Sequence, residues 1–288
     1  MTPVSHGKPC AGNPHARFDE GASAPEDPRR KALLHKEQIQ KALKQIESEH
    51  DCRILFAVES GSRAWGFASP DSDYDIRAVY VKPLYWYLGL EERQSDTINA
   101  ILPDDIDVAA WELRKALRQL LKSNASFMEW LGSPIVYHDC GLIAQLREME
   151  SRVVNPIAIA HHYASMLRHA LQDRTDDGTI SVKKLCYALR AGLCVRWTMD
   201  RETMPPTAFA EVRRGLDLGR EADEAIDRLF ALKERAREKE RTVPEAALLP
   251  LVEDCFVALE RHPWRSPSND IASARADLER TFRSHVFA

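Results

Sequence analysis

The sequence has no apolar stretch of the roughly 20 residues that a membrane-spanning helix requires. Its first residues, MTPVSHGKPCAGNPHARFDE, contain no apolar core of a signal peptide, so we expect no secretion by that route. The cysteines, at positions 10, 52, 140, 186, 194 and 255, form neither a CxxC pair nor the spacing of zinc ligands. These absences favour a cytoplasmic protein with reduced thiols, several of which fill its core.

Neither sign of charge is in large excess. The 288 residues include 40 Lys and Arg against 44 Asp and Glu, which gives a formal net charge of −4. This balance argues against a protein that coats polyanions through its overall charge, although it is compatible with a local basic face. The length predicts one elaborated domain or two modest ones.

The first part of the chain changes from an aperiodic segment to helix and strand patterns. Residues 1–29 are rich in Gly, Pro, Ala, Ser and charged residues, so we expect a flexible tail there. Apolar residues recur at helical spacing from about Arg30. The apolar run from Ile54 to Val58 fits a buried strand, and the alternating segment from Tyr74 to Val81 predicts a second. A third strand is expected over Ile106–Ala109.

The sequence after Trp111 has an almost entirely helical pattern. The segment WELRKALRQLLKSN predicts an amphipathic helix that ends at Asn124, with Ser126 capping a short turn behind it. Further helices are expected at residues 139–150, 156–173, 181–201, 221–240, 245–261 and 268–284. We therefore expect an α+β protein: a small mixed-sheet head over residues 30–137, followed by an all-helical C-terminal domain over residues 138–288.

One segment, GSRAWGFASPDSDYDIR, stands out for its chemistry. Gly61 and Ser62 follow a buried strand and open a turn or short helix, where backbone N–H groups and a hydroxyl can hold an anion. Gly66 permits a backbone conformation that other residues avoid. This part of the segment therefore predicts a site for phosphate groups.

Carboxylates follow at strand spacing. Asp73 and Asp75 stand two residues apart at the start of a strand, so both side chains project to one side. Asp107, on a neighbouring strand, would aim its carboxylate the same way. Hard oxygen ligands of this kind suit Mg²⁺ or Mn²⁺. Such a site could hold two ions, one activating the attacking hydroxyl and one stabilising the leaving group of a phosphoryl transfer.

Other interpretations of these acids stay open. The segment SPDSD is rich in turn-forming residues, so a polar loop between two strands is the simplest alternative for Asp73 and Asp75. Asp107 could be a solvated strand residue, and Asp104 and Asp105 lie beside it. Asp105 would use the same strand face as Asp107 and could replace it as the third carboxylate.

At this point the sequence resembles a known superfamily. Gly61-Ser62, ten intervening residues, Asp73-x-Asp75 and a later strand Asp are similar to the active-site signature of polymerase-β-like nucleotidyltransferases. The wider segments VESGSRAWGFASPDSDYDIR, WELRK, NASFMEWLGSPIVY and KKLCYALRAGLCVRW resemble a bacterial predicted nucleotidyltransferase family associated with RNA-repair operons. This resemblance covers about residues 50–210.

The resemblance implies a metal-dependent transfer of a nucleoside monophosphate from an NTP, with release of pyrophosphate. It places nucleotide-phosphate binding at Gly61 and Ser62, metal ligation at Asp73 and Asp75, and the third carboxylate at Asp107. It implies two Mg²⁺ or Mn²⁺ ions and does not fix the acceptor.

Arginines and a helical face extend the candidate nucleotide site. Arg63 and Arg77 could grip phosphate oxygens bidentately, or could equally form ion pairs with the neighbouring acids. In the helical half, residues 151–201 hold eight basic residues against four acidic ones. Within that stretch we expect a nucleotide- or nucleic-acid-facing surface formed by Lys183, Lys184, Tyr187 and Arg190, although a solvated face is the usual interpretation of such a run.

Three functions remain compatible with the sequence. The first is an enzyme that acts on an RNA end or a small hydroxyl acceptor. The second keeps the chemistry but modifies a protein partner, as antitoxin-type or AMP-transferring relatives do. The third is a nucleotide sensor without catalysis. None of them calls for a membrane.

Overall fold

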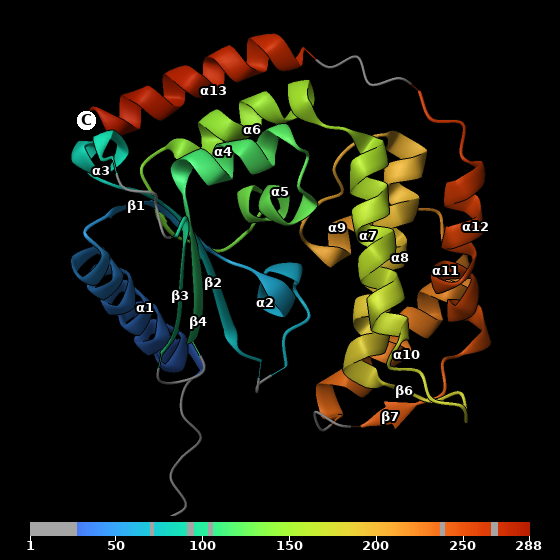
Figure 1. The fold of residues 1–288 in the computed structure, drawn as a ribbon. Coiled ribbons are helices and arrows are strands. Elements are labelled where there is room, and N and C mark those ends of the chain that lie inside the picture. Colours follow the sequence, from blue (N-terminus) through green and yellow to red (C-terminus); the bar gives the residue numbers. More distant parts are fainter. Residues whose placement is uncertain (1–27, 70–71, 91–94, 103–105, 237–239, 266–269) are drawn as a thin grey trace, which may run out of the picture. The chain divides into compact units, whose positions relative to one another are not determined.

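The computed structural model describes residues 28–69, 72–90, 95–102, 106–236, 240–265 and 270–288 (Figure 1). It divides into two compact units, Met1–Gln38 and Ile39–Ala288. The predicted tail lies outside the described residues up to residue 27, and the first helix, α1, begins at Pro28.

A five-stranded sheet has the strand order β3-β4-β2-β1-β5. Its strands are β1 (Arg53–Glu59), β2 (Tyr74–Val81), β3 (Thr97–Leu102), β4 (Ile106–Glu112) and β5 (Val136–Asp139). Because β2 and β4 run parallel and the other neighbours antiparallel, the sheet is mixed, as predicted. A short separate pair joins β6 (Ile180–Ser181) to β7 (Arg241–Thr242).

Helices pack on both faces of the sheet and make up most of the described chain after β5, which confirms the predicted α+β class (Figure 1). They are α1 (Pro28–His50), α2 (Gly61–Trp65), α3 (Leu84–Leu88), α4 (Leu113–Leu121), α5 (Ala125–Leu131), α6 (Leu142–Val153), α7 (Pro156–Leu171), α8 (Val182–Arg201), α9 (Phe209–Arg214), α10 (Arg220–Arg235), η1 (Ala246–Leu248), α11 (Leu249–Val252), α12 (Asp254–Arg261) and α13 (Ile271–Val286). The predicted domain boundary at residue 137 stays a prediction.

The alternation of side chains along β2 separates two cores. Ile76, Ala78 and Tyr80 pack with residues of α1 from Ile39 onward on one face of the sheet. The odd-numbered Val79 joins a larger core that includes α4 to α8 on the other face. Since successive strand residues point to opposite faces, Asp75 at the start of β2 lies on the same face of the sheet as Val79.

Two strands of the sheet were missed by the sequence prediction. β3 has the strand sequence TINAIL but only one buried side chain, Ile98, and therefore shows little alternation. β5 is a four-residue edge strand on which only Tyr137 is partly buried. Both strands gain their stability from pairing with a neighbour, which a local pattern does not reveal.

Helix ends also differ from the prediction. Trp111 and Glu112 belong to β4, and the Glu112 side chain caps α4 by accepting from Lys115 N at 3.3 Å. Asn124, not Ser126, caps α5 by accepting from Phe127 N at 2.9 Å. Both corrections follow one rule, because the residue before the first helical turn supplies the capping oxygen.

The helices predicted at 221–240 and 245–261 are shorter or divided. α10 ends at Arg235, and the second helix is split into η1, α11 and α12. Pro250 in the first turn of α11 has no N–H to extend a preceding helix, which accounts for that break. α9 was not predicted.

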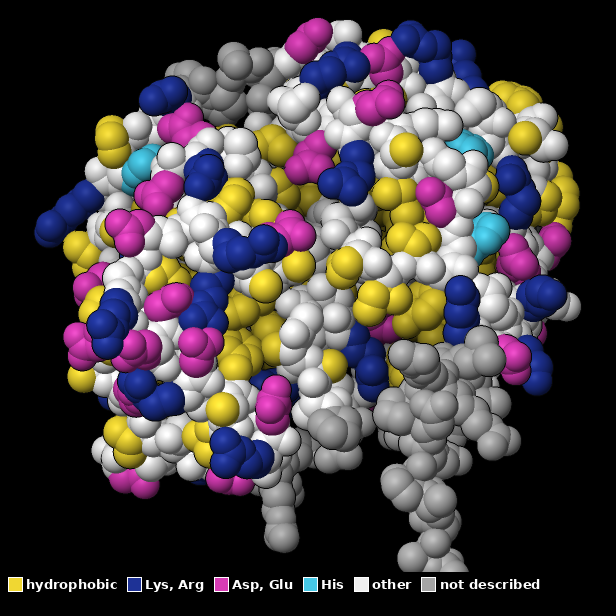
Figure 2. All heavy atoms as spheres, turned by 180° about the vertical axis from the view of Figure 1, so that it is seen from behind, with side chains coloured by type: hydrophobic (Ala, Val, Ile, Leu, Met, Phe, Trp, Pro, Cys, Tyr) yellow, Lys and Arg dark blue, Asp and Glu magenta, His cyan; other side chains and the backbone are white. Residues whose placement is uncertain are grey.

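The surface agrees with the balanced composition. On the face in Figure 2, basic and acidic side chains are interspersed over the described residues. No helix in the described part of the chain is long and apolar enough to cross a membrane.

A buried ion pair joins α5 to α8. Arg190 Nη2 lies 2.9 Å from Glu129 Oε1, and the two side chains are 1% and 7% exposed. Glu129 also accepts hydrogen bonds from Trp65 Nε1 at 3.1 Å and from Tyr163 OH at 2.6 Å. The guanidinium lies 4.2 Å from the centre of the Trp65 ring. One carboxylate therefore connects α2, α5, α7 and α8.

Removing one partner of this pair should be costly, because the other would remain charged and buried. We expect Arg190→Met to lower the free energy of unfolding by about 3–5 kcal/mol, measured by urea denaturation. The double variant Glu129→Gln/Arg190→Met should recover part of the loss. A loss below about 1 kcal/mol in the single variant would contradict this role.

Candidate active site

The turn between β1 and α2 brings the backbone of Gly61 against the side chain of Asp75. The two strands are linked beside it: Ser60 N donates to Asp75 O at 2.8 Å, and Asp75 N donates to Glu59 Oε1 at 2.8 Å. Gly61 has a φ of +61°, and a Cβ atom there would overlap Asp75 Oδ2. Glycine is therefore needed for its conformation and for the space that the carboxylate occupies.

Asp75 and Asp107 are direct neighbours in the parallel ladder between β2 and β4. Their side chains are 32% and 44% exposed, so both are open to solvent. Burial raises the pKa of Asp75, the charge of Arg77 lowers it, and the charges of Asp107 and Asp73 raise it again. The pKa of Asp75 is raised overall.

Arg77 lies between the two paired carboxylates. Its Nη2 atom is 3.0 Å from Asp75 Oδ1 and 2.9 Å from Asp107 Oδ2. Its Nη1 atom donates to Ile76 O at 3.0 Å. Two carboxylates at this separation repel unless a cation compensates them, and here a side chain of the protein supplies that charge.

Arg63 holds the loop that carries Asp73. Its Nε donates to Asp73 O at 3.0 Å and its Nη2 to Ser72 O at 2.7 Å, while the guanidinium stacks 3.8 Å from the centre of the Tyr74 ring. Arg63 therefore contacts the backbone of this loop rather than its carboxylates.

The donor set fits a hard divalent cation by its chemistry, since Asp73, Asp75 and Asp107 offer only carboxylate oxygens. Across the described residues, however, no three His, Cys, Asp or Glu side chains are grouped so that they could hold a metal ion. One oxygen of Asp75 and one of Asp107 contact the Arg77 guanidinium. The alternative ligand Asp105 lies outside the described residues.

A buried carboxylate at the end of β1 was missed by the sequence analysis. Glu59 is 0% exposed, and its two oxygens accept from Asp75 N and from Tyr137 OH. Burial raises its pKa, and the hydrogen bonds from Tyr137 and Asp75 and the charge of Arg63 oppose that shift. An acid that closes an otherwise apolar strand, directly before the Gly-Ser turn, is the signal that could have indicated it.

Lys183 and Tyr187 come to the carboxylates from α8. Burial raises the pKa of Asp75 overall, and the charge of Lys183 is one of the smaller causes that oppose this rise. Burial, together with the charges of Asp75 and Asp73, raises the pKa of Tyr187 to about 12. The structure thus brings two of the four predicted residues of this helix to the site.

The other two predicted residues of α8 lie elsewhere. Lys184 lies in the first turn of α8, where its backbone N–H donates to Ser181 Oγ at 3.4 Å, and it has no contact with the three carboxylates among the described interactions. Arg190 is buried against Glu129 and Trp65. We therefore assign Arg190 to the core ion pair and not to a surface that faces a nucleotide.

Aromatic residues fix the segment between the Gly-Ser turn and the aspartates. The Trp65 ring packs edge-on against Tyr187, with 5.3 Å between ring centres. Phe67 contacts Phe209 and Phe230, and Lys233 Nζ donates to Phe67 O at 2.7 Å. These contacts anchor the loop on α8, α9 and α10.

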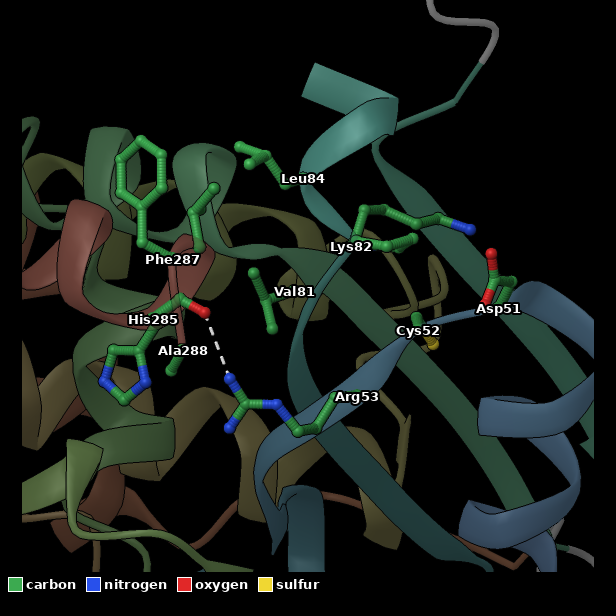
Figure 3. Close-up of a pocket in the computed structure, with 11 residues that line it drawn as sticks. Asp51, Cys52, Arg53, Val81, Lys82, Leu84, His285, Phe287 and Ala288 are labelled. Carbon is green, nitrogen blue, oxygen red and sulfur yellow. Dashed lines mark hydrogen bonds between the residues drawn. The ribbon is translucent and has the colours of Figure 1, made fainter. Parts of the chain in front are cut away.

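A pocket of about 450 Å³ lies where β1 begins and β2 ends, at the other end of these strands from the carboxylates (Figure 3). It is lined by Arg53, Lys82 and the last residues of the chain, and Arg53 Nη2 donates to His285 O at 3.0 Å. Because Arg53 begins β1 whereas Glu59 ends it, this pocket is separate from the carboxylates.

A mixed sheet that carries paired aspartates beside a Gly-Ser turn defines the class of the protein, a nucleotidyltransferase with a polymerase-β-like head. The match to a family model identifies it further. The model described as RNA repair pathway DNA polymerase beta family covers residues 35–284, and the chain belongs to this family.

Two similar proteins are described as uncharacterized, and one similar solved structure is described as nucleotidyltransferase-like. The uncharacterized protein YcgL of Bacillus subtilis (strain 168) is 39% identical over 204 residues, which are 70% of this chain and 78% of that protein. The uncharacterized protein MJ0002 of Methanocaldococcus jannaschii is 26% identical over 140 residues, 48% of this chain and 56% of that protein. A crystal structure of a nucleotidyltransferase-like protein from Exiguobacterium sibiricum 255-15 aligns with 12% identity and a TM-score of 0.30, over 85% of this chain and 80% of that chain.

The close approach of Gly61 to Asp75 makes a methyl group at this position a sensitive probe. Gly61→Ala should cost about 1–2 kcal/mol of stability for its positive φ and should also displace Asp75, reducing nucleotidyl transfer by about 100-fold. Gly141→Ala is the matched control, because Gly141 has a φ of +94° and nothing within 4 Å of the added atom. Equal activity of the two variants would contradict the assigned role of Gly61.

The raised pKa of Glu59 predicts a pH-dependent contribution to stability. Because the pKa of Glu59 is higher in the folded protein than the value of about 4.3 expected in the unfolded chain, the folded state holds the proton up to a higher pH. The stabilisation by Glu59 is therefore full below the unfolded pKa and is lost as the pH rises through the folded pKa. The free energy of unfolding of the wild type minus that of Glu59→Gln should therefore fall from pH 4 upward in urea titrations. A difference that is constant or rises with pH would show that Glu59 is not buried in this way.

Proposed function

We propose that the protein transfers a nucleoside monophosphate from an NTP to the hydroxyl of an RNA end, with release of pyrophosphate, in a reaction that depends on Mg²⁺. The observation that carries the proposal is the register of β2 and β4, which sets Asp75 beside Asp107 next to the Gly61 turn. Phosphoryl transfer requires mainly positioning and charge neutralisation, and this arrangement offers both.

The carboxylates have distinct positions in this proposal. Asp73 and Asp75 would hold the divalent cation, which would lower the pKa of the attacking hydroxyl and neutralise charge on the phosphates. Asp107 would accept the proton of that hydroxyl as its oxygen attacks the α-phosphorus and pyrophosphate leaves. Glu59 would keep Asp75 in place through the bond to its backbone N–H.

The phosphates of the NTP would contact the chain on two sides. Gly61 and Ser62 begin α2 beside Asp75, and the exposed Lys183 at the start of α8 carries a positive charge that acts on the same carboxylate. Arg63 would support this arrangement by fixing the Asp73 loop. A nucleotide bound here would lie between the sheet and α8.

RNA as the acceptor is supported by the description of the family. The basic excess over residues 151–201 supports it to a smaller extent, because Arg152, Arg174 and Arg190 pair with acids from outside this stretch, namely Asp277, Glu253 and Glu129. A phosphate backbone is attracted by such an excess even in a chain of net charge −4, because binding depends on the local field.

The experiment that tests the proposal combines each labelled NTP with Mg²⁺ or Mn²⁺ and RNAs of defined ends, followed by gel analysis. We expect label to appear on RNA with the wild type. Asp73→Asn should reduce this transfer by about 100-fold or more with an unchanged fold, because several kcal/mol of charge stabilisation is lost.

Asp176→Asn is the matched control, since Asp176 is an exposed acid in the turn between α7 and α8 that the site does not use. It should transfer label like the wild type. Unchanged turnover by Asp73→Asn would refute the catalytic assignment, and label on a protein instead of RNA would refute the acceptor alone.

A further inference from the structure

Arg77 occupies the place where a bound cation would compensate the two paired aspartates. A single nitrogen, Nη2, contacts both Asp75 Oδ1 and Asp107 Oδ2, at 3.0 and 2.9 Å. The Arg77 side chain is 19% exposed, less than either carboxylate. The guanidinium therefore lies behind the two acids and uses one oxygen of each.

We infer that Arg77 is the resting counter-ion of this site and competes with the divalent cation for Asp75 and Asp107. The inference rests on the proposed function, in which these acids bind the metal. It adds that the metal-free site is closed by the protein itself and opens only when the guanidinium leaves the carboxylates.

Competition follows from the geometry. Arg77 contacts Asp75 Oδ1, and Asp75 Oδ2 lies where a Cβ atom on Gly61 would stand, so the protein restricts the approach of a cation to this carboxylate. A divalent ion and a guanidinium on the same oxygens would repel each other strongly. The ion can bind fully only after Arg77 has moved, and part of its binding free energy is lost in displacing the ion pairs.

A second consequence concerns the nucleotide. The displaced guanidinium needs another anion, and a triphosphate bound beside Gly61 would be the nearest one. Arg77 would then exchange carboxylates for phosphate oxygens as metal and nucleotide bind together. The sequence is compatible with two roles for Arg77, an ion pair and a phosphate contact. These roles would then be two states of the same side chain.

The opposite role is also chemically reasonable and predicts the opposite result. If Arg77 only orients the carboxylates for the metal, its removal should weaken metal binding. If it competes with the metal, its removal should strengthen binding. The sign of the change therefore decides between a positioning residue and a counter-ion.

The test is calorimetric titration of MgCl₂ and MnCl₂ into the full chain without nucleotide. We expect Arg77→Gln to bind metal roughly fivefold more tightly than the wild type, as the loss of two partly exposed ion pairs would allow. Its melting temperature should be lower than that of the wild type without metal and should rise more when metal is added.

Arg114→Gln is the matched control, because it removes the same charge away from the aspartates. Arg114 lies over the rings of Tyr87 and Phe282. Its metal affinity should equal that of the wild type. Arg77→Lys serves if Arg77→Gln does not fold: an ammonium can replace only part of the bridge, so it should tighten binding less.

Equal or weaker metal binding by both Arg77 variants would overturn the inference. If Asp73→Asn then still abolished the binding seen in the wild type, the proposed metal site would stand without a counter-ion role for Arg77. If neither the wild type nor any variant bound metal at millimolar concentrations, the metal site and the inference would fail together.

Discussion

Two carboxylates on neighbouring parallel strands must be compensated by positive charge, and this requirement governs the site. The ladder between β2 and β4 fixes Asp75 beside Asp107, and no local adjustment of a loop can separate them. In the present structure Arg77 meets the requirement. In the proposed reaction a divalent cation would supply the positive charge instead. The repulsion between the two carboxylates, which Arg77 compensates in the metal-free protein, would then favour metal binding.

The rest of the fold keeps the surroundings of this pair in place. Glu59 ties the end of β1 to the backbone of Asp75, and Gly61 leaves room for its carboxylate. The buried pair Glu129–Arg190 then joins the following helix α2 to α5 and α8 through Trp65. The helical region is therefore part of the support of the site, and α8 also brings Lys183 to it.

The sequence predicted the mixed sheet, the main helices and the three strands β1, β2 and β4, because these elements have clear periodicity. It missed β3 and β5, whose side chains are largely exposed and whose pairing is not local. Among site residues, the adjacency of Asp75 and Asp107 follows from strand spacing. The burial of Arg190 could not be predicted in this way. Helical spacing places Lys183, Tyr187 and Arg190 on one face, but it does not reveal that Glu129 of another helix pairs with Arg190. Glu59 was missed for a related reason, since its partners come from β2 and β5.

The account depends on a cation site formed by Asp73, Asp75 and Asp107 and closed at rest by Arg77. The most direct measurement is a crystal structure with Mn²⁺ and a non-hydrolysable NTP analogue, with the ions located by anomalous scattering. The account predicts manganese on these aspartates, the triphosphate beside Gly61, and the Arg77 guanidinium moved from the carboxylates to a phosphate. Manganese and nucleotide bound away from the aspartates, with Arg77 still bridging them, would contradict it.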